Sequence, residues 1–181
     1  MSILSVYHVS SPELPNKVLT HLEDIASTLA EQGVVFERLP AITPVSAGAT
    51  HEEVVAAYRE PIGQLMNERG LVSSAVISVD ERHPQKAELR AGFLDEHRHE
   101  ANEVRFFVAG RGLCSFHVGD YVYTVLCEKN DLISIPAGTC QWFDIGEQPR
   151  VVVVRLFDTP DGQHAKMTEA TLAGQFPNLD D

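Results

Sequence analysis

A series of short segments with the two-residue period of β-strands fills the second half of the chain and most constrains its fold. Turn-forming residues separate these segments, as at Gly110-Arg111-Gly112 and Lys129-Asn130-Asp131. Closely spaced strands with turn chemistry at each break indicate an antiparallel sandwich or barrel. An earlier β-branched strand is expected at residues 75–79, and a short helix near residues 87–93. The other expected strands cover residues 104–108, 113–118, 121–127, 132–135, 141–145 and 151–157.

The first third of the chain reads as helical. Apolar residues recur at three- and four-residue steps between Val18 and Gly33, which predicts one helix. Thr50, with a glutamate three residues later, has the spacing of a capping box and begins a second expected helix that Gly70 ends. Pro61 lies inside this second helix and is expected to bend or weaken it.

Length and composition limit the organisation and the partners of the chain. Its 181 residues are enough for one domain with a sizeable core and too few for two comfortable ones. The 26 acidic residues outnumber the 14 basic ones, and the formal charge of -12 argues against a nucleic-acid partner. No apolar run is long enough to cross a bilayer, and the N-terminal residues lack a signal-peptide pattern. Three cysteines without CxxC spacing are typical of reduced thiols, so we expect a cytoplasmic protein without a membrane partner.

The segment around His97 and His99 carries the most distinctive chemistry. In an extended chain, side chains two residues apart point to one face, so these two imidazoles project together. Glu103 follows at the start of the next expected strand, where its carboxylate can turn toward the same point. Two imidazoles and one carboxylate form the facial ligand set of non-haem Fe(II) oxygenases, which leaves positions open for substrate and O2. The alternative for a HxH pair alone is a solvated turn in a charged segment.

The residues around this segment match the motifs of the cupin superfamily. A glycine stands before the HxH pair, and Gly110 follows Glu103 after six residues, as in the first cupin motif. Pro136 and Gly138 match the second motif. Gln141, however, stands where the superfamily has a histidine as the fourth metal ligand.

Longer strings resemble those of the bacterial acireductone dioxygenases, a cupin family, over nearly the whole chain. The resemblance implies a mainly β fold with peripheral helices, namely a cupin barrel of the jelly-roll or double-stranded β-helix type. We expect a single domain over residues 1–181, with a mostly helical region at 1–73, the barrel at 74–158 and a tail at 159–181 over the pocket. The matching strings are His97-Arg98-His99, Glu103-Val104-Arg105-Phe106-Phe107, residues 126–134, Trp142-Phe143-Asp144 and Arg155-Leu156-Phe157-Asp158.

The resemblance also implies an activity and roles for individual residues. The family cleaves an aliphatic enediol with O2 in methionine salvage, using Fe(II) or Ni(II), and the metal directs which bonds are broken. Carried over by position, His97, His99 and Glu103 are metal ligands, and Arg105 neutralises the enediolate oxygens. Glu96, beside the HxH pair, is a second expected catalytic residue. The expected cofactor is Fe(II), with Ni(II) as the alternative.

Gln141 is the main departure from the family pattern. An amide oxygen is a weak, hard ligand for iron or nickel, whereas a neutral imidazole is a good one. Three interpretations remain open: Gln141 coordinates weakly or through water, the ion is held poorly and catalysis is weakened, or another residue replaces the ligand. Cys140 and His164 are weak candidates for a replacement, and His117 is expected to face solvent.

Departures near the pocket leave two functions open. Gln163 stands where the family usually has an aromatic residue, which favours a changed substrate or lost activity. The first function is a dioxygenase acting on acireductone or a related enediol. The second is a metal-poor or non-catalytic cupin that binds a small acidic metabolite. The acidic surface favours a monomer.

Overall fold

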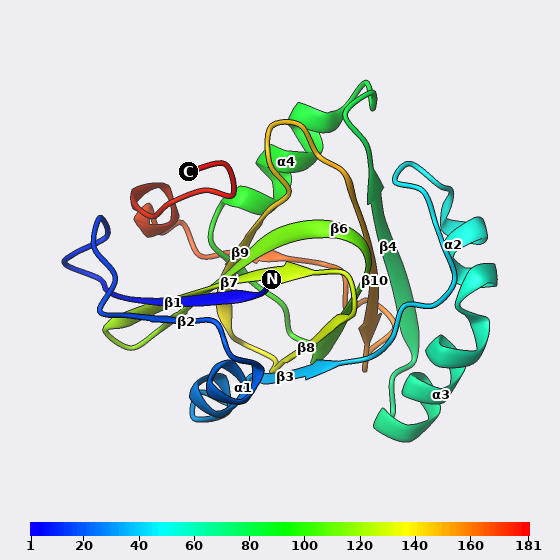
Figure 1. Cartoon of the computed structure of the whole chain (residues 1–181), viewed down its shortest axis with the longest axis horizontal. Helices are drawn as coiled ribbons and strands as arrows, with labels where there is room; N and C mark the ends of the chain where they lie inside the picture. The colour runs from blue at the N-terminus through cyan, green and yellow to red at the C-terminus, as the bar shows by residue number, and fades with distance from the viewer.

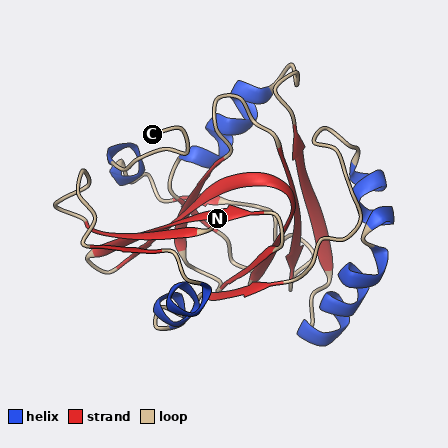
Figure 2. Cartoon of the chain, in the orientation of Figure 1, coloured by secondary structure: helices blue, strands red, loops and turns tan.

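Strands dominate the structure, a computed structural model that describes residues 1–181 (Figure 2). The strands are β1 (Ile3–His8), β2 (Lys17–Leu19), β3 (Val35–Arg38), β4 (Ser73–Val79), β5 (His97–Arg98), β6 (Glu103–Val118), β7 (Tyr121–Glu128), β8 (Asp131–Ile135), β9 (Cys140–Asp144), β10 (Val151–Phe157) and β11 (Lys166–Met167). The helices are α1 (Leu22–Ala30), α2 (His51–Ala57), α3 (Arg59–Arg69), α4 (Lys86–Leu94) and the 3-10 helix η1 (Leu172–Gln175). None of these helices has the length and apolar character needed to cross a membrane.

The strands form two antiparallel sheets that share one strand. One sheet has the order β11-β5-β9-β6-β7-β1-β2, and the other has the order β4-β10-β6-β8-β3. In Figure 1 the sheets curve around a common interior, and the helices lie outside it. This arrangement is the mainly β fold with peripheral helices that the sequence predicts.

β6 is a single long strand where the sequence predicts two. The expected strands at 104–108 and 113–118 merge, and the glycine-rich stretch between them is a bend rather than a turn. Gly110 has a φ of +70°, and a Cβ there would lie 1.7 Å from the carbonyl oxygen of Arg150. The register with β10 also shifts between Val152 and Val153, beside the bend. The prediction of two strands was wrong because the glycine lets β6 pass from one sheet to the other without ending.

Two helices, α2 and α3, take the place of the single helix expected from Thr50 to Gly70. The capping box is confirmed, because the Thr50 hydroxyl accepts a hydrogen bond from the Glu53 amide at 3.1 Å. The break lies at Tyr58, whose φ of -115° and ψ of 27° are not helical. Pro61 lies in the first turn of α3, where backbone N–H groups have no partner within the helix, so its missing N–H is tolerated. Gly70 ends α3 in the left-handed conformation, as expected.

The first third of the chain also supplies three strands that were not predicted. β1 pairs with β7, β2 pairs with β1, and β3 pairs with β8. The expected helix near residue 18 begins only at Leu22, because the preceding residues form β2. Its buried residues Ile25 and Leu29 join the main apolar cluster. The expected helical region therefore also closes both sheets at their edges.

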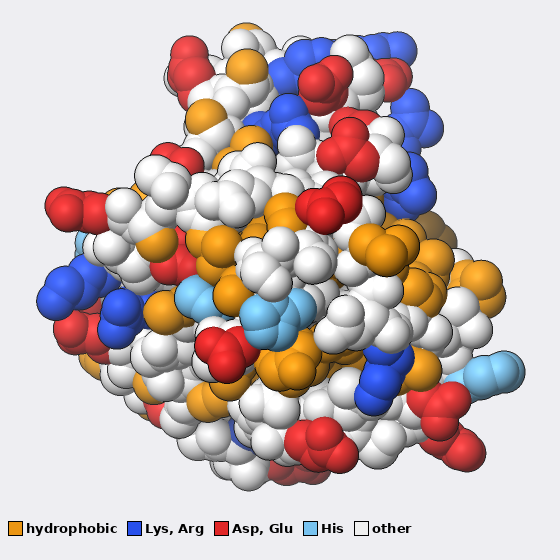
Figure 3. Space-filling view, turned by 90° about the vertical axis from the view of Figure 1, so that its left-hand side faces the viewer, with side chains coloured by type: hydrophobic (Ala, Val, Ile, Leu, Met, Phe, Trp, Pro, Cys, Tyr) orange, Lys and Arg blue, Asp and Glu red, His pale blue; other side chains and the backbone are white.

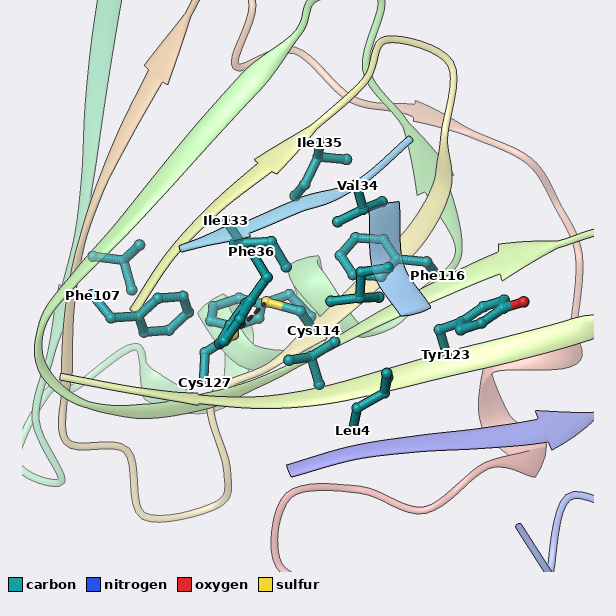
Figure 4. Close-up of a cluster of buried hydrophobic side chains, with 14 of the residues drawn as sticks. Leu4, Val34, Phe36, Phe107, Cys114, Phe116, Tyr123, Cys127, Ile133 and Ile135 are labelled. Atoms are coloured by element: carbon teal, nitrogen blue, oxygen red, sulfur yellow. Dashed lines mark hydrogen bonds between the residues drawn. The ribbon is translucent and has the colours of Figure 1, made fainter. Parts of the chain in front are cut away.

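Apolar side chains fill the interior between the sheets. Figure 4 shows the largest cluster, which includes Phe107 and Phe116 of β6 and Ile133 of β8. A second cluster lies between the helices α2 and α3 and the outer face of the second sheet. Figure 3 shows apolar side chains among charged and histidine side chains on the surface at the left of Figure 1. The candidate site borders the first cluster, because Arg105 lies over the ring of Phe143 at 5.2 Å.

Candidate active site

Six polar side chains gather where β6 begins, beside β5, β9 and β10. Each of them is at most 7% exposed. Arg105 of β6 lies opposite Arg155 of β10 in the strand register, and His97 of β5 lies opposite Gln141 of β9. Glu103 is two residues from Arg105 on β6, so both side chains share one face. The six residues are His97, His99, Glu103, Arg105, Gln141 and Arg155.

Both histidines are held in the tautomer that leaves Nε2 free. The Nδ1–H of His97 donates to the carbonyl oxygen of Asp95 at 2.7 Å. The Nδ1–H of His99 donates to the carbonyl oxygens of Gly162 and His164, each at 3.0 Å. Burial lowers the pKa of His97 to about 4, and burial also lowers the pKa of His99. At neutral pH both rings are therefore neutral, and each presents an Nε2 lone pair.

Glu103 is an ionised carboxylate between two guanidinium groups. Its Oε2 accepts hydrogen bonds from Arg105 Nε at 2.8 Å and from Arg155 Nε at 2.7 Å, and its Oε1 accepts one from Arg105 Nη2 at 3.3 Å. Burial alone would raise the pKa of Glu103, but the two arginines outweigh burial and hold that pKa well below its usual range. Two arginines against one carboxylate leave a surplus positive charge, which suits an anionic ligand.

Gln141 is placed differently from the metal ligand expected at its position. Its Oε1 accepts a hydrogen bond from Arg105 Nη2 at 2.9 Å. A guanidinium has donors only, so the amide oxygen, and not the amide nitrogen, must face Arg105. The oxygen that was expected to coordinate the ion is thus hydrogen-bonded to a cation.

The donor atoms of the group suit a divalent metal ion in type and number. His97 and His99 each have an unprotonated Nε2, and Glu103 Oε1, which accepts one hydrogen bond, keeps a lone pair. These donors form a two-histidine, one-carboxylate set. As the side chains lie, no three His, Cys, Asp or Glu residues converge closely enough to hold an ion. Arg155 Nη2, 3.4 Å from His99 Nε2, competes for one of those lone pairs.

Glu96 lies outside this group. Its carboxylate interacts with His117 Nδ1 at 3.1 Å and accepts a hydrogen bond from the hydroxyl of Thr168. The His117 ring, expected to face solvent, is partly exposed and also lies between Glu96 and the carbonyl oxygen of Gly119. Glu96 therefore joins β6 to the tail of the chain.

The tail lies against the site through its backbone. β11 pairs with β5, so that Met167 lies opposite His97. A surface cavity of about 540 Å³ lies between the tail and the segment around Arg98. The side chain of His164 is exposed, and Cys140 is only half-buried on β9. Neither of these two residues is placed to replace the missing imidazole.

Arg155 is the member of the group that was not assigned a role from the sequence. It is 7% exposed on β10, a strand whose other residues are all buried and apolar. A charge in such a strand must find a buried partner, and the partner is Glu103. The lone arginine in the run Val151–Phe157 was the signal that could have identified it.

The chain is similar to known proteins over most or all of its length. The family model described as the ARD/ARD' family matches residues 7–165. Proteins named acireductone dioxygenase match along the full length of both chains, with 66% identity in Stutzerimonas stutzeri and 63% in Pseudomonas fluorescens. A solved structure of acireductone dioxygenase from Bacillus anthracis, with a cadmium ion in the active center, is 27% identical, with a TM-score of 0.78. The alignment with that structure covers 92% of this chain and 98% of the other, and it confirms the cupin-type fold. This chain therefore belongs to the ARD/ARD' family.

Proposed function

We propose that the chain is a metal-dependent dioxygenase that cleaves acireductone, an enediol, with O2. One observation carries the proposal: two neutral imidazoles, one ionised carboxylate and two arginines share a buried site. The full-length relatives named acireductone dioxygenase support the same activity.

The metal is held by His97, His99 and Glu103 in this proposal, with Fe(II) as the ion and Ni(II) as the alternative. The free Nε2 atoms and the remaining lone pair of Glu103 Oε1 support these roles. A bound ion would supply Lewis-acid charge compensation and a template for the substrate. The cadmium ion in the active center of the Bacillus anthracis structure supports a divalent ion.

The arginines bind and orient the substrate. Arg105 and Arg155 both donate to Glu103, and together they leave one positive charge uncompensated. An enediolate would neutralise this charge, and the buried setting would strengthen the attraction. Arg155 also lies over the ring of Phe157 at 5.0 Å, which restricts its guanidinium to one side of the site. Glu96 acts in this proposal by holding the tail through Thr168 rather than by touching the substrate.

The proposed setting is methionine salvage in the cytoplasm, with the chain acting as a monomer. The methylthio-bearing enediol of that pathway is the substrate that the names of the relatives imply. We assign the whole chain to one cupin domain, because strands of the first third pair with strands of the barrel.

The test is metal loading followed by O2 uptake. The purified protein is loaded with Fe(II) without oxygen, its metal content is measured, and O2 consumption is followed after acireductone is added. We expect close to one ion per chain and substrate-dependent O2 uptake, with both lost in His97→Ala. His51→Ala changes an exposed histidine and is the matched control. Less than about a tenth of an equivalent of metal would contradict the proposal.

A second function has one specific observation in its favour. The arginines already satisfy most of the lone pairs of Glu103, and no three ligand side chains converge. This arrangement favours a metal-poor cupin that binds a small acidic metabolite. Tight binding of an anion by chelator-treated protein, without any metal uptake, would support this function over the first.

A further inference from the structure

We propose that Gln141 is a substrate-positioning residue and not a metal ligand: its oxygen fixes Arg105, and its amide nitrogen donates a hydrogen bond to an oxyanion of the ligand. The inference rests on the proposed enediol substrate and names a further residue that selects it. The expected role of residue 141 thereby changes from metal ligand to hydrogen-bond donor toward the substrate.

The first step is the orientation of the amide. Arg105 Nη2 lies 2.9 Å from Gln141 Oε1 and 3.3 Å from Glu103 Oε1, so the amide is the nearer of its two acceptors. Turning the amide round would bring two donors together, because a guanidinium has no lone pair. Coordination through Oε1 would also draw a divalent cation toward this guanidinium, which like charges disfavour.

The second step concerns the amide nitrogen. Gln141 Nε2 makes no hydrogen bond to the protein, and the side chain is only 2% exposed. The fully buried side-chain atoms without a partner are Ser115 Oγ and Asp131 Oδ1. Gln141 Nε2 is not among them and therefore keeps some exposed surface, on a residue that lies opposite His97 in the strand register. An accessible donor that lacks a protein partner is available to a ligand.

The third step is the chemistry of the ligand that fits. Arg105, Arg155 and Gln141 present donors, while the single carboxylate is already hydrogen-bonded to both arginines. Such a group binds a small anion with two neighbouring oxygens, as in an enediolate or an oxalate-like dicarboxylate. A neutral histidine at position 141 would offer its free nitrogen to the metal instead. The glutamine therefore exchanges one metal ligand for one hydrogen bond to the substrate.

Two variants separate the two roles. Gln141→Leu removes both polar atoms at similar volume, and Gln141→Glu keeps an acceptor for Arg105 but replaces the N–H donors with a second oxygen. Because Gln141→Glu retains the contact with Arg105, it guards against loss of folding in Gln141→Leu. Thermal unfolding of both variants is measured first.

Metal binding is measured by chelator competition and by the absorption spectrum of the Co(II)-loaded protein. We expect Gln141→Leu to bind Co(II) within about twofold of the unchanged protein, with the same spectrum, because no ligand is lost. A tenfold weaker affinity or a shifted spectrum would show that Gln141 coordinates the ion, and would overturn the inference.

Anion binding is measured by calorimetric titration of the metal-loaded protein with acireductone in the absence of O2, and separately with oxalate. We expect Gln141→Leu to weaken acireductone binding by about tenfold, and Gln141→Glu to weaken it further through charge repulsion. Unchanged affinity in both variants would overturn the inference. If the unchanged protein binds oxalate in a Gln141-dependent way but not acireductone, the proposed substrate fails and the donor role stands. If it binds neither anion, both fail.

Discussion

Arg155 contacts two of the three residues that are proposed as metal ligands, Glu103 and His99. Its Nε donates to Glu103 Oε2, and its Nη2 lies 3.4 Å from the free nitrogen of His99. A guanidinium so close to the proposed ion site repels a divalent cation and attracts an anionic substrate. If the proposed ligands hold the ion, this one side chain sets the balance between binding the ion and binding the substrate.

Arg155→Met should shift this balance toward the ion. The variant removes one positive charge, and Arg105 remains to pair with Glu103. We expect Co(II) affinity to rise by about tenfold, while the KM for acireductone rises by a similar factor. Chelator competition and O2 uptake measure the two effects. Arg111→Met, at an exposed arginine of β6, should change neither quantity. Weaker metal binding in Arg155→Met would contradict this account.

Part of the site could be predicted from the sequence at the scale of single residues. The HxH spacing and the carboxylate at Glu103 could be read directly, because side chains two residues apart share a face. The partners across the barrel could not be read in this way. Spacing along one strand does not reveal that Arg105 would bind Gln141, or that Glu96 would turn toward Thr168.

At the scale of secondary-structure elements, the bend in β6 is needed to bring strands of both sheets around the site. Gly110 combines a φ of +70° with a backbone oxygen where its Cβ would stand. The bend separates the part of β6 that carries Glu103 and Arg105 from the part that carries Cys114 and Phe116. No other residue combines the required φ with the required absence of a side chain.

Gly110→Ala should therefore be far more destabilising than the same change at Gly119. Gly119 has a φ of +60°, but a Cβ there would have no atom within 4 Å, so only backbone strain of about 1 kcal/mol applies. At Gly110 the clash with Arg150 adds to this strain, and we expect a loss of roughly 3 kcal/mol or more. Urea unfolding of both variants measures the difference. Equal losses would show that the backbone relaxes around residue 110.

The tail depends on the hydrogen bonds of one hydroxyl group, that of Thr168, which contacts the carboxylate and the carbonyl oxygen of Glu96 and the amide of Ala170. The hydroxyl of Thr168 donates to the Glu96 carboxylate next to β11. Thr168→Val should lower the stability of the docked tail by about 1 kcal/mol and increase trypsin cleavage after Lys166 by about fivefold. Mass spectrometry of timed digests measures the rate. Thr171→Val is the control, because Thr171 makes no side-chain hydrogen bond at the start of η1. Equal rates in the two variants would contradict the role of Thr168.

Elements were predicted well where local signals decide them. The capping box at Thr50 and the left-handed Gly70 marked the two ends of the α2–α3 region correctly. The strands β1 and β3 were missed because their stability comes from pairing with β7 and β8, which are distant in sequence. The break at Tyr58 lies three residues before Pro61, the residue that was expected to bend or weaken this helix and that cannot donate a hydrogen bond to the carbonyl oxygen of Ala57.

At the scale of the whole molecule, Asp144 joins three distant segments. Its carboxylate accepts hydrogen bonds from Arg90 of α4, from the Gly146 amide and from the Leu179 amide near the end of the chain. Burial alone would raise the pKa of Asp144, but these hydrogen bonds outweigh burial and lower it below its usual value. The ionised form is therefore favoured in the folded state.

Stability should accordingly depend on pH through Asp144. The pKa of the Asp144 carboxyl is lower in the folded state than in the unfolded state, so this group stabilises the fold at pH values above its unfolded pKa. The stabilisation is lost as the pH falls toward the folded pKa. We expect Asp144→Asn to lower the free energy of unfolding by roughly 2 kcal/mol at neutral pH. This gap between the variant and the unchanged protein should narrow below about pH 4. Urea unfolding at a series of pH values measures the gap, with exposed Asp120→Asn as the control. A gap that is constant down to low pH would contradict the assignment.

The monomeric state proposed above also belongs to this scale. Apolar side chains in Figure 3 are interrupted by charged and histidine side chains, and the formal charge of the chain is -12. Light scattering after size exclusion should give the mass of one chain, 20.0 kDa. A stable dimer would contradict this proposal without affecting the site.

The shared strand β6 also determines how a ligand can leave. Because β6 is covalently continuous through both sheets, the two sheets cannot separate completely while β6 stays paired in both. Complete separation would require β6 to leave either its ladders with β7 and β9 or its ladders with β8 and β10. The tail is held by a two-residue strand pairing, by hydrogen bonds such as that of Thr168, and by the packing of Ala173 and Phe176 against Tyr7 and Trp142. Its detachment breaks fewer backbone pairings than separation of the sheets would. We therefore expect the residence time of a ligand to depend on detachment of the tail, and not on the stability of the barrel that surrounds the ligand.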